Sequence, residues 1–555
     1  MVASLAGLTD RYLDFVSEHH PIYATFLGLH ANDETLGRFS KEAHAGRRET
    51  AGSLLTKLEA LPPAGADTSE LVDREVLRIA LRGAVFSHDT LKSHERDPVH
   101  YIGAALSGCN QLLLRDFAPL GERARRFVAR LREIPRVLAE CIENVRNPPS
   151  AFALLAAGYA RGGLSFLDAT VPALSREVPS LSEELESASK AAGEAFEGAA
   201  DHFASVGSES EVPFHVGREA YEWMLREIHL LELDSDELLE LGSCAVSEIS
   251  AEMDEAAARV DGSRSWRDLV EDLAKSHPTA DELRDAYASE MAGAREFVER
   301  ERLVTMPEGE ELSVVDTPVF LRSLLPYAAY GPPGPFEERQ QGIFYVTPVD
   351  AEASAAEQEG QLRGHPTHGI RVIALHEAYP GHHLQLVRAN LNRGKTRKLA
   401  RSNVFIEGWA LYCEEMMREQ GFLRGASMRL MQLKAALWRA ARVVVDVRLQ
   451  RGEMSLREAA DFMVSEASLT PDKAAAEVRR YAMNPTQPSS YMLGKLAIRD
   501  IRTRYEGRAG RSFDLRTFHD ELLDLGSVPP RLAEAALGLA EIGPGTSGPS
   551  RGREA

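Results

Sequence analysis

The residues with the clearest capacity for chemistry lie in the segment Arg371–Gln385, which contains His376, Glu377, His382 and His383. Imidazoles and carboxylates are common zinc ligands in hydrolytic enzymes, and a glutamate beside the first histidine can take a proton from the attacking water. In the HExxH arrangement the two histidines lie one helical turn apart on one face. Here the next histidines come six and seven residues after His376, so the segment predicts a metal site with altered spacing.

Pro380 occupies the position, four residues after His376, where the usual motif has its second histidine. Proline lacks the amide proton that would bond back to the preceding turn, and its ring clashes with that turn. We therefore expect the helix to widen or break there. Gly381 can take dihedral angles that other residues avoid, and can return His382 to the metal side. His383 is the alternative to His382 as the second ligand.

A second segment, Asn403–Glu414, carries Glu407 in apolar helical surroundings. A buried carboxylate is rare unless it is paired or bound to a metal. The chain between His382 and Glu407 is long enough for one helix to end and for a second to run back antiparallel. Glu414, two turns further on, either supports a liganding histidine or belongs to a solvated helix face.

The rest of the chain predicts a mainly α protein, because apolar residues recur at helical spacing over long stretches rich in Ala, Leu, Glu and Arg. Clear examples are Glu122–Val145, Ser182–Ser205, Asp236–Val260 and Ser427–Arg451. One segment, Gly342–Pro348, has the pattern of a strand, which needs a partner strand elsewhere or pairs with an extended substrate.

Composition and charge exclude several classes of protein. The chain has 555 residues, 44% of them hydrophobic, and a net charge of −20 from 84 acidic and 64 basic residues, which disfavours a nucleic-acid partner. The four cysteines are scattered without a CxxC pair, as in a protein of the reducing cytosol. We find no signal peptide and no membrane span, and we expect a cytoplasmic protein without membrane contact.

Several separated motifs resemble those of the bacterial DUF885 family: PIYATFLGLH, GIFYVTP, HEAYPGHHLQ, FIEGWALY and PTQPSSYMLGK. The resemblance extends over most of the chain. Because the family is grouped with the zincin metallopeptidases, it implies a large helical zincin-like fold with a deep cleft and a small β element near the active site. We expect residues 1–542 to form one large helical metallohydrolase domain, long enough for two lobes around the cleft. Residues 543–555, rich in Gly, Ser and Pro, are expected to be a disordered tail.

Carried over residue by residue, the resemblance implies that Zn²⁺ is bound by His376, His382 and Glu407, with Glu377 as the general base. His383 remains the alternative ligand. The implied reaction is hydrolysis of an amide bond in a small peptide or peptide-like substrate by zinc-activated water. The sequence gives no indication of the oligomeric state.

Four further residues are candidates for contacts near the reaction. Tyr491 begins a predicted helix after a polar turn, where its hydroxyl either stabilises the oxyanion or packs at the helix start. Tyr345, Arg448 and Lys495 are candidates for binding substrate. Lys495 suits a substrate carboxylate, although a basic residue on a helix is often only solvated.

Three positions bear on which substrate is used. Related sequences carry a Gly-Leu-His pattern where this chain has Arg448 and Gln450, and a Pro-Gly-Gln where it has Thr486 in the middle. These departures leave two alternatives to a peptidase: a zinc hydrolase of a small biosynthetic amide or ester, and a non-catalytic helical scaffold. On the same helix as Arg448, Arg442 and Asp446 are four residues apart, which predicts an ion pair between them.

Overall fold

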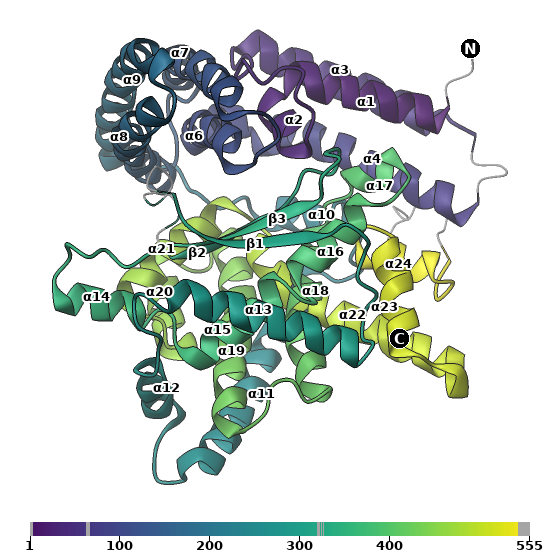
Figure 1. Ribbon diagram of the computed structural model, residues 1–555. Helices are drawn as coiled ribbons and strands as arrows, with labels where there is room; N and C mark the ends of the chain where they lie inside the picture. The colour runs from purple at the N-terminus through teal and green to yellow at the C-terminus, as the bar shows by residue number, and fades with distance from the viewer. Residues whose placement is uncertain (1–3, 63–66, 319–321, 323–324, 326, 542–555) are drawn as a thin grey trace.

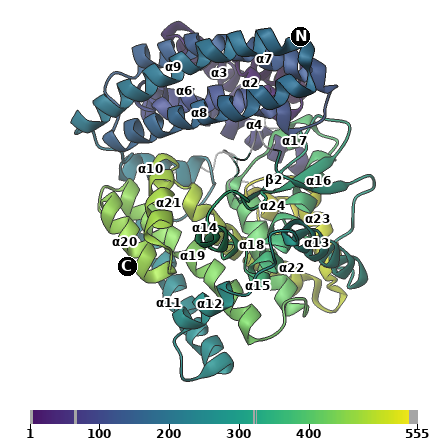
Figure 2. The same cartoon turned by 60° about the vertical axis from the view of Figure 1, so that its left-hand side comes forward.

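The structure is a computed structural model that describes residues 4–62, 67–318, 322, 325 and 327–541. It is built mainly of α-helices, as predicted, and Figures 1 and 2 show the first helices as a layer over the rest of the chain. The helices of this N-terminal layer are α1 (Leu5–His19), α2 (Pro21–Leu27), α3 (Lys41–Glu59), α4 (Thr68–Phe86), α5 (Ser93–Arg96), α6 (Pro98–Leu114), α7 (Leu120–Asn144), α8 (Ser150–Glu177) and α9 (Ser182–Glu209), with a short π-helix, η1 (Ser87–Leu91).

The second part of the chain contains the predicted metal-binding segments. Its helices are α10 (Arg218–Glu227), α11 (Ser235–Asp261), α12 (Trp266–Ala274), α13 (Leu283–Arg300), α14 (Ala355–Leu362), α15 (Thr367–Glu377), α16 (His382–Asn390), α17 (Lys395–Leu399), α18 (Asn403–Glu419), α19 (Ala426–Gln450), α20 (Leu456–Ala467), α21 (Pro471–Met483), α22 (Gln487–Ala509), α23 (Leu515–Asp524) and α24 (Pro530–Ala536). The four helices predicted from periodicity appear as α7, α9, α11 and α19, with ends within a few residues of those expected. Residues 543–555, predicted to be disordered, lie outside the described residues.

A three-stranded sheet lies between the N-terminal layer and the helices below it (Figure 1). Its strands are β1 (Glu311–Asp316), β2 (Ala328–Gly331) and β3 (Gln341–Val346) in the order β1-β3-β2. β3 is the predicted strand, and it runs parallel to β1 and antiparallel to β2. Of the two alternatives for this strand, the partner strands are confirmed, and pairing with an extended substrate is wrong because both edges of β3 are already paired within the sheet.

Two glycines let α18 and α22 approach until their backbones touch. A Cβ atom added at Gly408 would lie 2.3 Å from the Cα of Gly494, and one added at Gly494 would lie 1.7 Å from the carbonyl oxygen of Val404. No larger residue fits at either position without separating the helices. This contact aligns two predicted site residues, Glu407 on α18 and Tyr491 on α22.

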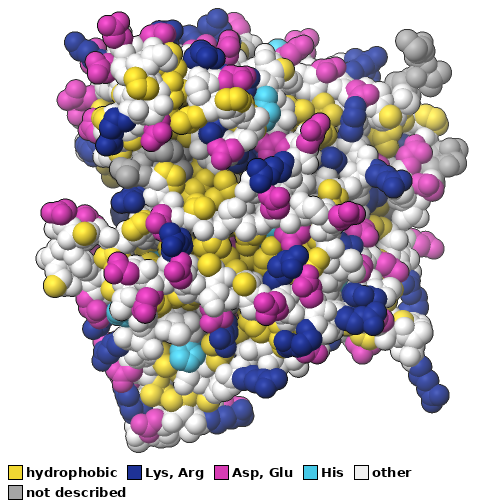
Figure 3. Space-filling view, in the orientation of Figure 1, with side chains coloured by type: hydrophobic (Ala, Val, Ile, Leu, Met, Phe, Trp, Pro, Cys, Tyr) yellow, Lys and Arg dark blue, Asp and Glu magenta, His cyan; other side chains and the backbone are white. Residues whose placement is uncertain are grey.

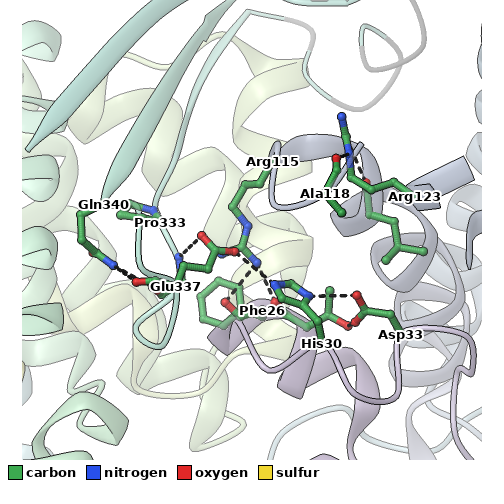
Figure 4. Close-up of polar contacts among 12 residues, drawn as sticks. Phe26, His30, Asp33, Arg115, Ala118, Arg123, Pro333, Glu337 and Gln340 are labelled. Carbon is green, nitrogen blue, oxygen red and sulfur yellow. Dashed lines mark hydrogen bonds and ion pairs between the residues drawn. The ribbon is translucent and has the colours of Figure 1, made fainter. Parts of the chain in front are cut away.

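A polar junction ties the N-terminal layer to the loop between β2 and β3 (Figure 4). Arg115, after α6, donates to the carbonyl oxygen of Thr25 at 2.7 Å and pairs with Glu337 at 3.0 Å. His30 lies beside the same carboxylate and contacts Asp33 at 2.9 Å. These groups are largely buried, so removing one partner leaves an uncompensated charge in the interior. The junction therefore stabilises the position of the layer over the sheet.

The predicted ion pair between Arg442 and Asp446 does not form. Arg442 donates to the hydroxyl of Tyr481 at 2.9 Å, whereas Asp446 accepts from Tyr221 at 2.9 Å and from Ser489 at 2.6 Å. Both side chains are buried on α19 between other helices, which supply better aligned partners than the next turn of the same helix. Burial raises the pKa of Asp446 to about 7 despite these hydrogen bonds.

The state of the cysteines and the distribution of charge on the surface can also be described. All four cysteines, which lie in the described part of the chain, are free thiols, as predicted. Among the described helices, none has the length and apolar content needed to cross a bilayer. Acidic and basic side chains are interspersed on the face seen in Figure 3, and hydrophobic side chains gather where the N-terminal layer meets the part below. The predicted deep cleft stays a prediction.

Candidate metal centre

The helix that carries His376 breaks as Pro380 predicts. α15 ends at Glu377 and α16 begins at His382, with a four-residue turn between them. Gly381 is required in this turn because a Cβ atom there would lie 1.8 Å from the carbonyl oxygen of His376. Glycine is needed at this position because the backbone of α15 comes so close to it. It is not needed for left-handed dihedral angles, since the φ of Gly381 is −70°.

The break brings the two histidines together. The ring centroids of His376 and His382 are 4.8 Å apart with the rings nearly perpendicular, and both side chains are buried. One potential ligand atom from each of His376, Glu377 and His382 lies within 4.8 Å of the others. In the described part of the chain no other group of three or more histidine, cysteine or acidic residues meets this condition.

Glu414 supports His376 from behind. Its carboxylate oxygen lies 2.8 Å from Nδ1 of His376, and the residue is 1% exposed. The alternative that Glu414 belongs to a solvated helix face is therefore wrong. A carboxylate on one imidazole nitrogen fixes the orientation of the ring and leaves the other nitrogen, Nε2, for a second partner.

Glu407 borders the same group from α18. Its Oε2 atom lies 3.3 Å from Nε2 of His382. Burial raises the pKa of this carboxyl, but the hydrogen bond and charge of His382 outweigh that effect and lower the pKa to about 2. Glu407 is thus a carboxylate at neutral pH, in contact with one of the two histidines.

His383, the alternative ligand, points elsewhere. Its Nε2 atom lies 2.8 Å from Glu310 and its Nδ1 atom 2.9 Å from the hydroxyl of Tyr330, and its side chain is fully buried. Burial would raise the pKa of Glu310, but hydrogen bonds with His383 and Tyr379 lower it to about 2. With both ring nitrogens occupied, His383 joins α16 to the sheet and is not in the group around His376.

Tyr491 lies in the first turn of α22 beside Glu407. Its hydrogen bond contributes to the lowered pKa of that carboxyl. The guanidinium carbon of Arg442 is 4.8 Å from the centroid of the Tyr491 ring, and that of Arg439 is 6.0 Å away. Tyr491 therefore has its hydroxyl near the candidate centre and its ring between cations, an arrangement that suits either of its predicted roles.

Comparison with known proteins shows which family the chain belongs to. The family described as "Bacterial protein of unknown function (DUF885)" matches residues 21–537. This chain belongs to the DUF885 family. No curated protein matches it.

Two solved structures share the fold of this DUF885 chain. One is a putative lipoprotein of unknown function from Shewanella oneidensis, with 24% sequence identity and a TM-score of 0.79 over 96% of this chain and 99% of the other. The second is a putative lipoprotein from Colwellia psychrerythraea, with 20% identity, a TM-score of 0.79, and coverage of 97% and 99%. At these identities the likeness extends to the fold alone.

The predicted substrate-binding residues of the DUF885 chain do not gather at the centre. The hydroxyl of Tyr345 donates to the carbonyl oxygen of Leu114 at 2.6 Å, and the side chain is buried. Arg448 lines a separate hollow between α11, α19 and α20. Lys495 lies closer to the centre than these two residues. Burial lowers the pKa of Lys495, and the nearby charges of Glu415 and of Glu414, which supports His376, partly oppose that shift.

Sequence reasoning missed a group of cations on α19 and α21, of which Arg439 lies at the centre. Arg439 lies 4.0 Å from Glu414 and over the Tyr491 ring. Lys473 lies over the ring of Trp438 at 4.6 Å, and Lys434 is close enough that its pKa is lowered by burial and by the charge of Lys473. Neither lysine forms an ion pair within the described residues. The signal was available in the sequence of α19, where Trp438 and Arg439 are adjacent and Lys434 and Arg442 lie about one turn away on either side.

Proposed function

We propose that this chain is a zinc-dependent hydrolase of amide bonds in small peptides or peptide-like molecules. His376, His382 and Glu407 are the proposed ligands, and Glu377 is the proposed general base. The observation that carries the proposal is the pair of buried imidazoles, each in contact with a carboxylate, with Glu377 as a third carboxylate close to both.

The donor set fits a divalent cation. Glu377, Glu407 and Glu414 lie around two buried imidazoles, and imidazoles and carboxylates are the donors that zinc takes in hydrolytic sites. Two atoms bound to one tetrahedral zinc at about 2.0–2.2 Å lie about 3.4 Å apart, close to the 3.3 Å between His382 and Glu407.

The protein groups have separate tasks in the proposed reaction. A zinc ion held by His376, His382 and Glu407 would polarise the amide carbonyl and lower the pKa of the attacking water. Glu377 accepts a proton from the attacking water as the oxygen–carbon bond forms, and then delivers it to the nitrogen as the carbon–nitrogen bond breaks. Tyr491 donates a hydrogen bond to the oxygen of the tetrahedral intermediate. Glu414 holds His376 in orientation throughout.

Positive charge beside the centre supports a substrate with a free carboxylate. Arg439 lies over the Tyr491 ring at 6.0 Å, and Lys473 is near enough to Arg439 and Arg442 that their charges help to lower its pKa, after burial and against the charge of Glu477. The terminal carboxylate of a short peptide suits such a wall. Blocked and unblocked dipeptides differ in this group, so a panel of both separates a peptidase from a hydrolase of one small amide or ester.

Metal analysis of purified variants tests the ligands directly. We expect about one zinc per chain in the wild type and little in the His376→Ala, His382→Ala and Glu407→Ala proteins. His383→Ala is the matched control, because it removes a neighbouring buried imidazole that contacts Glu310 instead. Undiminished zinc in His376→Ala, or loss of zinc in a folded His383→Ala with retention in His382→Ala, contradicts this ligand set.

A further inference from the structure

A cavity of about 490 Å³ lies within the N-terminal layer, apart from the candidate metal centre. It is partly open to solvent and is lined by α1–α6, η1 and the loop between α2 and α3, with all of its lining residues between Phe15 and Gln111. Its volume is in the range of small-molecule sites. Four aromatic side chains form much of its wall: Phe15, Tyr23, Phe26 and Phe39.

The charges around this cavity are unusual for so acidic a chain. No described lining residue is an aspartate or a glutamate, although the chain carries 84 of them. Two arginines line it, and Arg48 is neutralised by Asp89 in a two-pronged contact. Arg47 instead donates to the carbonyl oxygen of Arg38 at 2.6 Å and contacts Nδ1 of His44 at 2.9 Å. Within the described residues it forms no ion pair.

Six histidines complete the lining: His19, His20, His44, His88, His94 and His100. Burial, and then the charge of Arg47, lower the pKa of His20 to about 3, that of His44 to about 2 and that of His100 to about 4. These imidazoles are therefore neutral at physiological pH, and a neutral imidazole donates from one nitrogen and accepts at the other. Both nitrogens of His44 are already in contact with Arg47 and Tyr101, which leaves His20 and His100 to face a ligand. Arg47 supplies the positive charge that no wall carboxylate balances.

Other ligand chemistries fit this cavity less well. A cation would be repelled by Arg47. A metal ion needs converging ligand atoms, and no three of the described imidazoles here bring theirs together as His376 and His382 do with Glu377. A phosphate dianion calls for more than one free cationic group and for many donors. An apolar body suits the aromatic wall, and a single negative charge suits the guanidinium.

We propose that this cavity binds a small organic carboxylate with an aromatic body, its carboxylate held by Arg47 and its ring packed against the four aromatic side chains. The neutral imidazoles supply hydrogen bonds around the carboxylate. One lining residue also faces the second part of the chain: the guanidinium carbon of Arg401, six residues before Glu407, lies 4.6 Å from the centroid of the Phe26 ring. The site is distinct from the proposed active site and does not depend on it.

Three probes with the same body separate the head-group chemistry: 4-phenylbutyrate, 4-phenylbutan-1-ol and 4-phenylbutylamine. Calorimetric titration into the full chain is expected to give the tightest binding for the carboxylate and the weakest for the amine. Arg47→Gln should weaken binding of the carboxylate about tenfold or more while changing that of the alcohol little. Arg48→Gln is the matched control and should bind like the wild type, since Asp89 already occupies that guanidinium.

A second variant fills the cavity without touching Arg47. A Cβ atom added at Gly103 meets nothing closer than Val99 at 3.9 Å, so the side chain of Gly103→Leu has room to enter the hollow. It should abolish binding of both the carboxylate and the alcohol. Gly158→Leu is the control, because Gly158 lies on the exposed face of α8 with no atom within 4 Å of its added Cβ.

Several results would overturn the proposal. They are equal affinity for the three probes, no binding of 4-phenylbutyrate at millimolar concentration, or wild-type binding by Gly103→Leu. Loss of binding in His376→Ala would instead place the carboxylate at the candidate metal centre, which also excludes the cavity as its site. Unchanged binding in His376→Ala supports the cavity whether or not zinc hydrolysis is found.

Discussion

Two groups of histidines lie in opposite electrostatic surroundings in this chain. At the candidate metal centre, His376 contacts Glu414 and His382 contacts Glu407. In the N-terminal cavity, His44 contacts Arg47 and Tyr101. Three other lining histidines have a carboxylate nearby, with Glu18 at 3.9 Å from His19, Glu95 at 3.8 Å from His94, and Asp89 at 2.9 Å from His88 and also paired with Arg48. The residue types are the same, but the partners decide what the imidazoles can bind. A cation suits the first group, and an anion suits the second.

Glu377→Gln should have the largest effect on activity, because it removes the proposed base while keeping the shape of the side chain. Turnover of a cleaved dipeptide should fall by about a hundredfold or more with zinc content unchanged. Glu338→Gln, at an exposed position outside both histidine groups, serves as the control. Normal turnover by the Glu377→Gln protein would contradict the mechanism.

Tyr491→Phe should come next. A hydrogen bond to the oxyanion is commonly worth about 3 kcal/mol in the barrier, so the rate constant should drop by about a hundredfold. Substrate affinity and zinc content should stay near normal, because the bond is made mainly in the transition state. If the variant loses thermal stability and keeps its turnover, Tyr491 is a packing residue.

Removing the carboxylate behind a histidine tests the difference between the two groups. Glu414→Gln should weaken zinc binding by about ten- to a hundredfold, since an outer carboxylate orients a liganding imidazole. The double variant His88→Ala and His94→Ala removes two imidazoles from the cavity and should leave the zinc content as it was. Equal losses of zinc in both proteins would show that carboxylate partners do not distinguish the two groups.

The smallest expected effect is on stability in acid. The folded-state pKa of His44 is lowered to about 2 by burial and by the charge of Arg47, while an unfolded histidine titrates near 6.5. The unfolded chain therefore binds more protons at this residue below about pH 6.5, and stability is lost as the pH falls from there. His44→Gln should lose less stability between pH 7 and pH 5, which urea unfolding of the two proteins measures. If the wild type and His44→Gln lose the same stability between pH 7 and pH 5, His44 is protonated in the folded protein as readily as in the unfolded chain.

The sequence predicted the long helices well and the short strands poorly. Apolar periodicity located α7, α9, α11 and α19, because one helical face is buried over many turns. β2 has four residues, and β1 mixes Glu, Ser and Asp with its valines, so neither showed a strand pattern. The pairing of β3 on both edges could not be predicted without them.

Within the candidate site, local sequence predicted the break at Pro380 but not the partners across helices. The spacing between Glu407 and Glu414 does not tell which of them faces His376, since that depends on how α18 packs against α15. The roles of His383 and Arg442 depended in the same way on Glu310 and Tyr481, which lie far away in the chain. The cavity histidines are spread from His19 to His100, so no local pattern indicated them.

The contact between Gly408 and Gly494 has a consequence for motion. With their backbones touching, α18 and α22 have no side-chain layer between them that could shear or repack. Opening of the candidate centre to admit substrate would then carry Glu407 and Tyr491 along as one rigid body. The displacement would fall on the turn between α15 and α16 or on the sheet, and the spacing of carboxylate and phenol would persist through each cycle.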